Sequence, residues 1–128
     1  MPRAGARVLV VEDDDDLRGM LEDTLTDAGF SVRGASHGAE ALRLLQHEIP
    51  NVIVLDLMLP WVNGIEVLAT VRQQPHLLNV PVLVVTGTVT SAFDLRSFGP
   101  LRVLRKPLDV EALVPTIHDL LNDVSTQR

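Results

Sequence analysis

A buried strand that ends on an acidic residue is the feature that most limits how this chain can fold. The apolar residues 52–55 run directly into Asp56, and the turn-forming residues Pro60 and Asn63-Gly64 follow. A continuous apolar run bounded by turn residues is typical of a strand covered on both faces. Because an unpaired charge is very costly to bury, the Asp56 carboxylate cannot lie inside such a sheet. We therefore expect it at the carboxyl edge, where open α/β sheets bind their ligands.

Short apolar or alternating segments predict the strands, and apolar residues at helical spacing predict the helices. Strands are expected at residues 7–11, 30–35, 52–56, 81–85 and 101–105. Helices are expected at residues 14–28, from a cap at Ser36 to the stop at Ile49-Pro50, from Ile65 to Gln74, and from a cap at Asp109 to about Val124. Residues 92–98 allow a helix of about two turns before Gly99-Pro100.

Alternating strands and helices with short connections require a parallel sheet with helices on both faces. Five strands in a chain of 128 residues fit the flavodoxin-like (βα)5 fold, a doubly wound parallel sheet with strand order 2-1-3-4-5. No internal linker or low-complexity segment divides the chain. We predict a single domain at residues 6–124, followed by a polar tail at residues 125–128.

Composition excludes several classes of function. The net charge of -6 repels a phosphate backbone, and aromatic residues make up only 3% of the chain, so direct nucleic-acid binding is not expected. No apolar run approaches the length of a membrane span, and no apolar segment of a signal peptide follows the first arginines. The chain has no cysteine, which excludes disulfides and thiolate metal sites. We expect a cytoplasmic protein that does not contact membranes.

Polar side chains follow four of the predicted strands at the same edge of the sheet. They are Glu12 and Asp13 after the first strand, Asp56 after the third, Thr86 after the fourth and Lys106 after the fifth. Three carboxylates that lie close together repel one another, and a hard divalent cation relieves that repulsion. Carboxylates are ligands that Mg²⁺ prefers, and an amine and a hydroxyl suit the oxygens of a phosphoryl group. The sequence therefore predicts a Mg²⁺ site that can receive a phosphoryl group.

Five motifs, in this order and spacing, resemble the response-regulator receiver domain of two-component signalling, in particular receivers of the chemotaxis type. They are the strand with Glu12-Asp13-Asp14, the segment from Asp56 to Pro60, Asn63-Gly64, Val85-Thr86-Gly87 and Arg105-Lys106-Pro107. The similarity covers about residues 7–124. It implies a phosphoprotein of a phosphorelay in signal transduction, which receives a phosphoryl group and then changes its interactions.

The resemblance also implies a role for each residue of the site. Asp56 corresponds to the phosphoacceptor, and Glu12, Asp13, Asp56 and the backbone carbonyl of Met58 correspond to the Mg²⁺ ligands. Thr86 corresponds to the switch hydroxyl that binds the phosphoryl group. Lys106 corresponds to the lysine on another phosphoryl oxygen, and the Lys106-Pro107 peptide is usually cis in the family.

The implied partners are a sensor histidine kinase or phosphotransfer protein and an effector protein or fused output domain. A homodimer through the fourth helix, the fifth strand and the last helix is also implied. Such a domain catalyses its own phosphorylation and dephosphorylation and is not otherwise an enzyme. Two departures concern the output: Val103 stands where the family commonly has an aromatic residue, and the segment from Thr86 to Lys106 is slightly short.

Two other functions are compatible with parts of this pattern. A haloacid-dehalogenase-type phosphohydrolase also uses an aspartate after a strand, but it needs a second aspartate where this chain has Met58. A receiver-like interaction module could work without phosphorylation, which would leave the five site residues unexplained. A flavodoxin is disfavoured because acidic residues, and no phosphate-binding loop, follow the first strand.

Several conspicuous residues have simpler interpretations. The acids at residues 14–16 suit the first turn of a solvated helix. Trp61 is expected to be exposed or half-buried beside the site and useful as a fluorescence probe. The four histidines share no ligand spacing and are expected at the surface. The Met58 side chain cannot orient a water molecule, which predicts slow loss of the phosphoryl group.

Overall fold

The strands form one parallel sheet in the predicted flavodoxin-like order. The computed structural model describes residues 5–87, 95 and 98–126. The sheet has the order β2-β1-β3-β4-β5. The strands are β1 (Arg7–Val11), β2 (Ser31–Ala35), β3 (Val52–Asp56), β4 (Val82–Thr86) and β5 (Leu101–Arg105). These bounds agree with the sequence-based prediction to within one residue.

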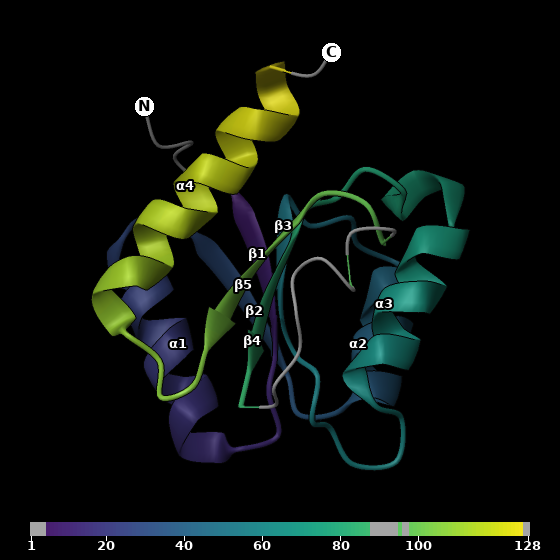
Figure 1. Ribbon diagram of the computed structural model, residues 1–128, viewed down its shortest axis with the longest axis horizontal. Coiled ribbons are helices and arrows are strands. Elements are labelled where there is room, and N and C mark those ends of the chain that lie inside the picture. Colours follow the sequence, from purple (N-terminus) through teal and green to yellow (C-terminus); the bar gives the residue numbers. More distant parts are fainter. Residues whose placement is uncertain (1–4, 88–94, 96–97, 127–128) are drawn as a thin grey trace.

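Helices cover both faces of the sheet (Figure 1). They are α1 (Asp15–Asp27), α2 (Gly38–Leu45), α3 (Gly64–Gln73), the 3₁₀ turn η1 (Pro75–Leu77) and α4 (Val110–Thr126). Apolar residues of α1 and α4 pack on one face of β1, β3 and β4, and those of α2 and α3 pack on the other. No helix in the described part of the chain is long and apolar enough to cross a membrane.

The central strands are fully buried, and the edge strands are not. Every residue of β3 and β4 is buried, as their continuous apolar sequences predict. In β2 and β5, exposed or half-buried residues dominate. The two edge strands are therefore less deeply buried than the central strands.

Helix caps account for most of the observed boundaries. The Asp14 side chain accepts hydrogen bonds from the N–H groups of Asp16 and Leu17, at 2.9 and 3.0 Å, and so begins α1. Gly29, with φ of 98°, follows the end of α1, as predicted. The Asp109 side chain accepts from the N–H of Glu111 at 3.0 Å and caps α4.

The predicted cap of the second helix is wrong. The cap of α2 is His37, whose Nδ1 accepts from the N–H of Glu40 at 3.2 Å, and Ser36 instead donates its own N–H to the Glu40 carboxylate at 2.7 Å. An imidazole nitrogen can accept this bond because the neutral ring keeps one unprotonated nitrogen. The helix also ends at Leu45, before Ile49.

Two predictions concern the last part of the chain. The helix expected at residues 92–98 lies largely outside the residues that the structure describes. The last helix continues to Thr126, slightly beyond its expected end.

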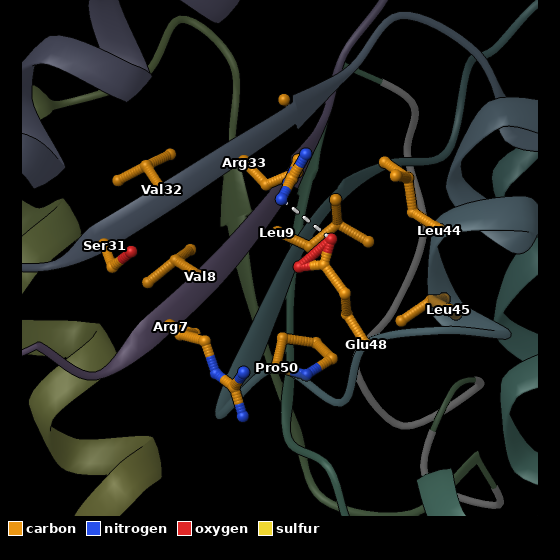
Figure 2. A pocket seen from close by; sticks show the side chains of 11 residues that line it. Arg7, Val8, Leu9, Ser31, Val32, Arg33, Leu44, Leu45, Glu48 and Pro50 are labelled. Atoms are coloured by element: carbon orange, nitrogen blue, oxygen red, sulfur yellow. Dashed lines mark ion pairs between the residues drawn. The ribbon is translucent and has the colours of Figure 1, made fainter.

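A surface pocket of about 450 Å³ lies at the amino ends of β1 and β2, next to the end of α2. Figure 2 shows Arg33 of β2 reaching towards Glu48, with which it forms an ion pair of 2.9 Å. The lining of this pocket includes none of the predicted site residues, which lie at the carboxyl ends of the strands. The candidate site is therefore separate from the pocket.

Candidate functional site

The topology brings the predicted site residues to one edge of the sheet, at the bottom of Figure 1. Glu12 and Asp13 follow β1, Asp56 ends β3, Thr86 ends β4 and Lys106 follows β5. Glu12, Asp56 and Thr86 are buried, whereas Asp13 is exposed. The sheet therefore turns residues from distant parts of the sequence into one cluster.

Lys106 joins the two buried carboxylates of the cluster. Its Nζ lies 3.0 Å from Glu12 Oε1 and 3.0 Å from Asp56 Oδ2, and it donates a hydrogen bond to the latter. The side chain of Lys106 is 27% exposed, whereas both carboxylates that it contacts are buried. The peptide bond from Lys106 to Pro107 is cis, as the resemblance implied.

The carboxylates fit a hard divalent cation. Oxygens of Glu12, Asp13 and Asp56 lie within 4.8 Å of one another. Glu12 Oε1 is buried and accepts no hydrogen bond of normal geometry from the described residues. Oxygen donors with a spare lone pair are what Mg²⁺ requires. These three residues could hold the predicted ion. The Met58 carbonyl as a further ligand remains a prediction.

The charge of Glu12 is sensitive to its surroundings. Burial raises the pKa of Glu12 from 4.5 to about 7, although Lys106 and the Asp14 N–H oppose this shift and the Asp56 charge adds to it. Burial alone would lower the pKa of Lys106, but pairing with Glu12 and Asp56 raises it overall. The lysine is therefore charged at neutral pH, and Glu12 is close to its titration point.

This environment predicts a pH-dependent metal affinity. Since Mg²⁺ needs the ionised carboxylate, it should bind about tenfold more weakly at about pH 6 than at about pH 8. Between pH 4.5 and 7 the folded, metal-free chain retains a proton that the unfolded chain releases, so its stability should fall as the pH rises. Calorimetric titration with Mg²⁺ measures the first effect, and urea unfolding measures the second. In Glu12→Gln both dependences should flatten; a wild-type affinity that is constant from pH 6 to 8 would contradict the assignment.

The Asp56 carboxylate is also held by the chain that follows it. Its Oδ1 accepts the N–H of Met58 at 2.9 Å, while the Met58 side chain is 62% exposed. Gly64 donates its N–H to the Leu57 carbonyl at 3.0 Å, and Asn63 caps α3 by accepting from the N–H of Glu66. The loop after β3 is therefore fixed at both ends around the acid.

A tryptophan projects from this loop. Trp61 is 89% exposed, as expected, and its ring meets the His37 ring edge-on at a centroid distance of 6.0 Å. Its φ of 63° is unusual for a bulky residue, and the turn is closed by a hydrogen bond of 2.8 Å from the Val62 N–H to the Pro60 carbonyl. Because it is the chain's single tryptophan and lies in the loop after Asp56, we expect its fluorescence to report on events at this residue.

One residue that supports the site was not predicted from the sequence. Arg18 donates to the backbone carbonyl of Glu12 at 3.0 Å and forms an ion pair of 2.7 Å with Asp15. It thereby fixes the backbone that carries the acid pair. The spacing of Asp15 and Arg18 suggests the ion pair, but nothing local indicates the bond back to Glu12.

Comparisons with known proteins agree with this geometry. Residues 8–118 match the response regulator receiver domain. The response regulator MprA of Mycobacterium sp. (strain KMS) is 34% identical over 93% of this chain and 52% of its own length. The transcriptional regulatory protein GlrR of Escherichia coli (strain K12) is 32% identical over 94% of this chain and 27% of its own length.

Solved structures give the same result. The chemotaxis response regulator CheY4 of Vibrio cholerae has a TM-score of 0.84 and 32% identity, covering 91% of this chain and 98% of that chain. Of the two sequence relatives named above, the chain spans about half the length of MprA and about a quarter of the length of GlrR. With the family match covering most of the sequence, the chain belongs to the response-regulator receiver domains of two-component signal transduction.

Proposed function

We propose that this chain accepts a phosphoryl group on Asp56 from the phosphohistidine of a sensor histidine kinase or phosphotransfer protein. The observation that carries the proposal is the setting of the Asp56 carboxylate. It is buried at the end of β3, with the Lys106 ammonium 3.0 Å away and carboxylate oxygens of Glu12 and Asp13 within 4.8 Å.

In the proposed step an Asp56 oxygen attacks phosphorus. The new O–P bond forms as the P–N bond of the phosphohistidine breaks, and the electron pair of that bond returns to the imidazole nitrogen. Phosphoryl transfer of this kind passes through a loose transition state, so the protein mainly supplies position and charge. Two hydrogen bonds hold the attacking carboxylate in position, one from the Lys106 ammonium to Oδ2 and one from the Met58 N–H to Oδ1.

Lys106 and Thr86 are proposed to bind the transferred group. Lys106 leaves its contact with Asp56 Oδ2 and donates to a phosphoryl oxygen, and the buried Thr86 at the end of β4 donates to another. Mg²⁺, held by Glu12, Asp13, Asp56 and the Met58 carbonyl, would neutralise charge on the carboxylates and on the phosphoryl oxygens. Self-catalysed loss of the phosphoryl group, slow because Met58 cannot orient water, is part of the same proposal.

The output is proposed to be a change in binding to an effector protein or fused output domain. In this chain Val103 of β5 is a half-buried side chain without the reach of the aromatic residue common in the family. We therefore propose that Thr86 acts on the output face without an aromatic partner at this position. A homodimer through β5, α4 and the helix expected at residues 92–98, and a cytoplasmic location, also remain proposals.

Phosphorylation with a small donor tests the central step. Purified chain with Mg²⁺ and acetyl phosphate should gain the mass of one phosphoryl group, and Asp56→Asn should gain none, because an amide is not a nucleophile here. Trp61 fluorescence should follow the same reaction. The matched control is Asp16→Asn, which changes an exposed acid of α1 outside the predicted ligand set. If Asp56→Asn is labelled as fast as wild type, Asp56 is not the phosphoacceptor. If wild type gains no mass, the receiver-like module without phosphorylation becomes the better proposal.

A further inference from the structure

A half-buried arginine at the opposite end of the sheet is surrounded by backbone carbonyl oxygens. Arg72 lies in the last turn of α3, and its guanidinium donates through Nε, Nη1 and Nη2. The acceptors are the carbonyl oxygens of Leu77 (3.1 Å), Leu78 (3.0 Å), Val80 (2.6 Å), Pro100 (3.0 Å) and Phe98. One side chain thus connects the end of α3 with two segments that follow it far apart in the sequence.

The contacts match the chemistry of arginine and of no other residue. In the described part of the chain, no carboxylate forms an ion pair with Arg72. Removing the guanidinium from water lowers the pKa of Arg72, and the carbonyl oxygens replace the lost hydration. A planar fork of five N–H donors can serve several acceptors in fixed directions, whereas a lysine ammonium has three donors at one point.

The acceptors include residues that lead directly into two strands. Val80 comes shortly before β4, and Pro100 immediately precedes β5. The Pro100 carbonyl also accepts the N–H of Val82, the first residue of β4, at 3.0 Å. At the other end of the same strand pair, the Lys106 N–H donates to the Thr86 carbonyl at 3.0 Å. Arg72 thus ties together the starts of the two strands whose far ends carry Thr86 and Lys106.

Strand β5 is less deeply buried than the central strands. It is an edge strand that pairs with β4 alone, and each of its residues is exposed or half-buried. The chain before it can approach the guanidinium because residue 99 is glycine: φ is 84°, and a Cβ there would lie 2.7 Å from Arg72 Nε. The ladder with β4, partly buried apolar residues and an ion pair between Arg102 and Asp123 also hold β5, and the hydrogen bonds at its start add to them.

We propose that Arg72 is a positioning residue for phosphoryl transfer, because it fixes β5 against β4 and so sets Lys106 relative to Thr86 and Asp56. The inference rests on the proposed function for its kinetic consequence, but the clamp itself can be tested separately. The proposed role concerns the part of the site that β4 and β5 carry, namely Thr86 and Lys106. The carboxylates of Glu12, Asp13 and Asp56 come from β1 and β3, and we expect Arg72 not to affect them.

The experiment compares Arg72→Gln and Arg72→Lys with wild type and with the control Arg43→Gln, which changes an exposed arginine near the end of α2. In Arg72→Gln, labelling of Asp56 by acetyl phosphate should slow about tenfold, since small displacements of a catalytic group are costly. The amides of Val82 and Lys106 should exchange with deuterium about tenfold faster than in wild type. Mg²⁺ affinity should not weaken. Arg72→Lys should fall between Arg72→Gln and wild type, and the control should match wild type.

Three results would overturn the inference. The first is wild-type labelling and wild-type exchange at Val82 and Lys106 in both Arg72 variants. The second is a parallel loss of Mg²⁺ affinity and faster exchange in β1 and β3, which would make Arg72 a general support of the fold. The third is faster exchange at the two amides with an unchanged labelling rate.

Two further points keep the test decisive. If Arg72→Gln does not fold, Arg72→Lys and Gly99→Ala, which crowds the guanidinium without removing it, give the same comparison. If wild type itself is not labelled, the proposed function fails, and the exchange measurements still decide whether Arg72 clamps β5.

Discussion

Replacing Lys106 with methionine should slow labelling of Asp56 by acetyl phosphate about 10²- to 10³-fold, the usual effect of losing one charge-stabilising donor. Methionine keeps the unbranched stem but removes the ammonium that lies 3.0 Å from both Glu12 and Asp56. The transferred group would then lack its main cationic partner from the protein. Intact-mass kinetics at saturating Mg²⁺ measures the rate.

Lys106→Met should also make the stability of the chain depend more strongly on Mg²⁺. Without the ammonium, two buried carboxylates face each other, and the metal-free chain should lose about 3 kcal/mol of unfolding free energy at about pH 8. Mg²⁺ should restore more stability in Lys106→Met than in wild type, because the ion supplies the missing positive charge. Arg105→Met, at the adjacent exposed position, is the matched control and should behave as wild type. Labelling of Lys106→Met within a factor of about three of wild type would contradict the role of the lysine.

The central part of this site could be predicted because it follows from topology. Once the apolar runs are assigned to parallel strands, the residue after each run must lie at the shared carboxyl edge. This holds for Glu12, Asp13, Asp56, Thr86 and Lys106, which come from four strand ends. No interaction between these residues has to be known in advance. The topology predicts where these residues lie. The roles of all of them, and that of the Met58 carbonyl, remain predictions, because each role concerns a metal ion or a phosphoryl group that would bind.

The supporting contacts could not be predicted because they join residues that share no local pattern. Arg72 is separated by 26 and 28 positions from two of its acceptors, and those acceptors are backbone carbonyls, which every residue has. His37 replaces the expected Ser36 as a cap because one ring nitrogen happens to face the first turn of α2. Sequence patterns report which residues are buried, and they report much less about which donor meets which carbonyl.

Glycine at position 64 illustrates the same limit and gives the largest expected effect on stability. The sequence predicts only a turn at Asn63-Gly64. In the structure, a Cβ at residue 64 would overlap the carbonyl oxygen of Asp56 and the Cα of Leu57. These are backbone atoms of the proposed phosphoacceptor and of the residue after it, so no side chain can move aside to make room.

Gly64→Ala should therefore lower the unfolding free energy by about 3 kcal/mol or more, at the upper end of overpacking effects. It should also weaken Mg²⁺ binding, because relief of the overlap must move the backbone of Asp56 relative to Glu12 and Asp13. Urea unfolding and Mg²⁺ calorimetry measure the two changes. Gly19→Ala is the matched control: it lies inside α1 with no atom within 4 Å of an added Cβ, so alanine should stabilise the chain by about 0.5–1 kcal/mol. An unchanged unfolding midpoint in Gly64→Ala would mean that α3 can shift away from β3, and that the position of Asp56 does not depend on this contact.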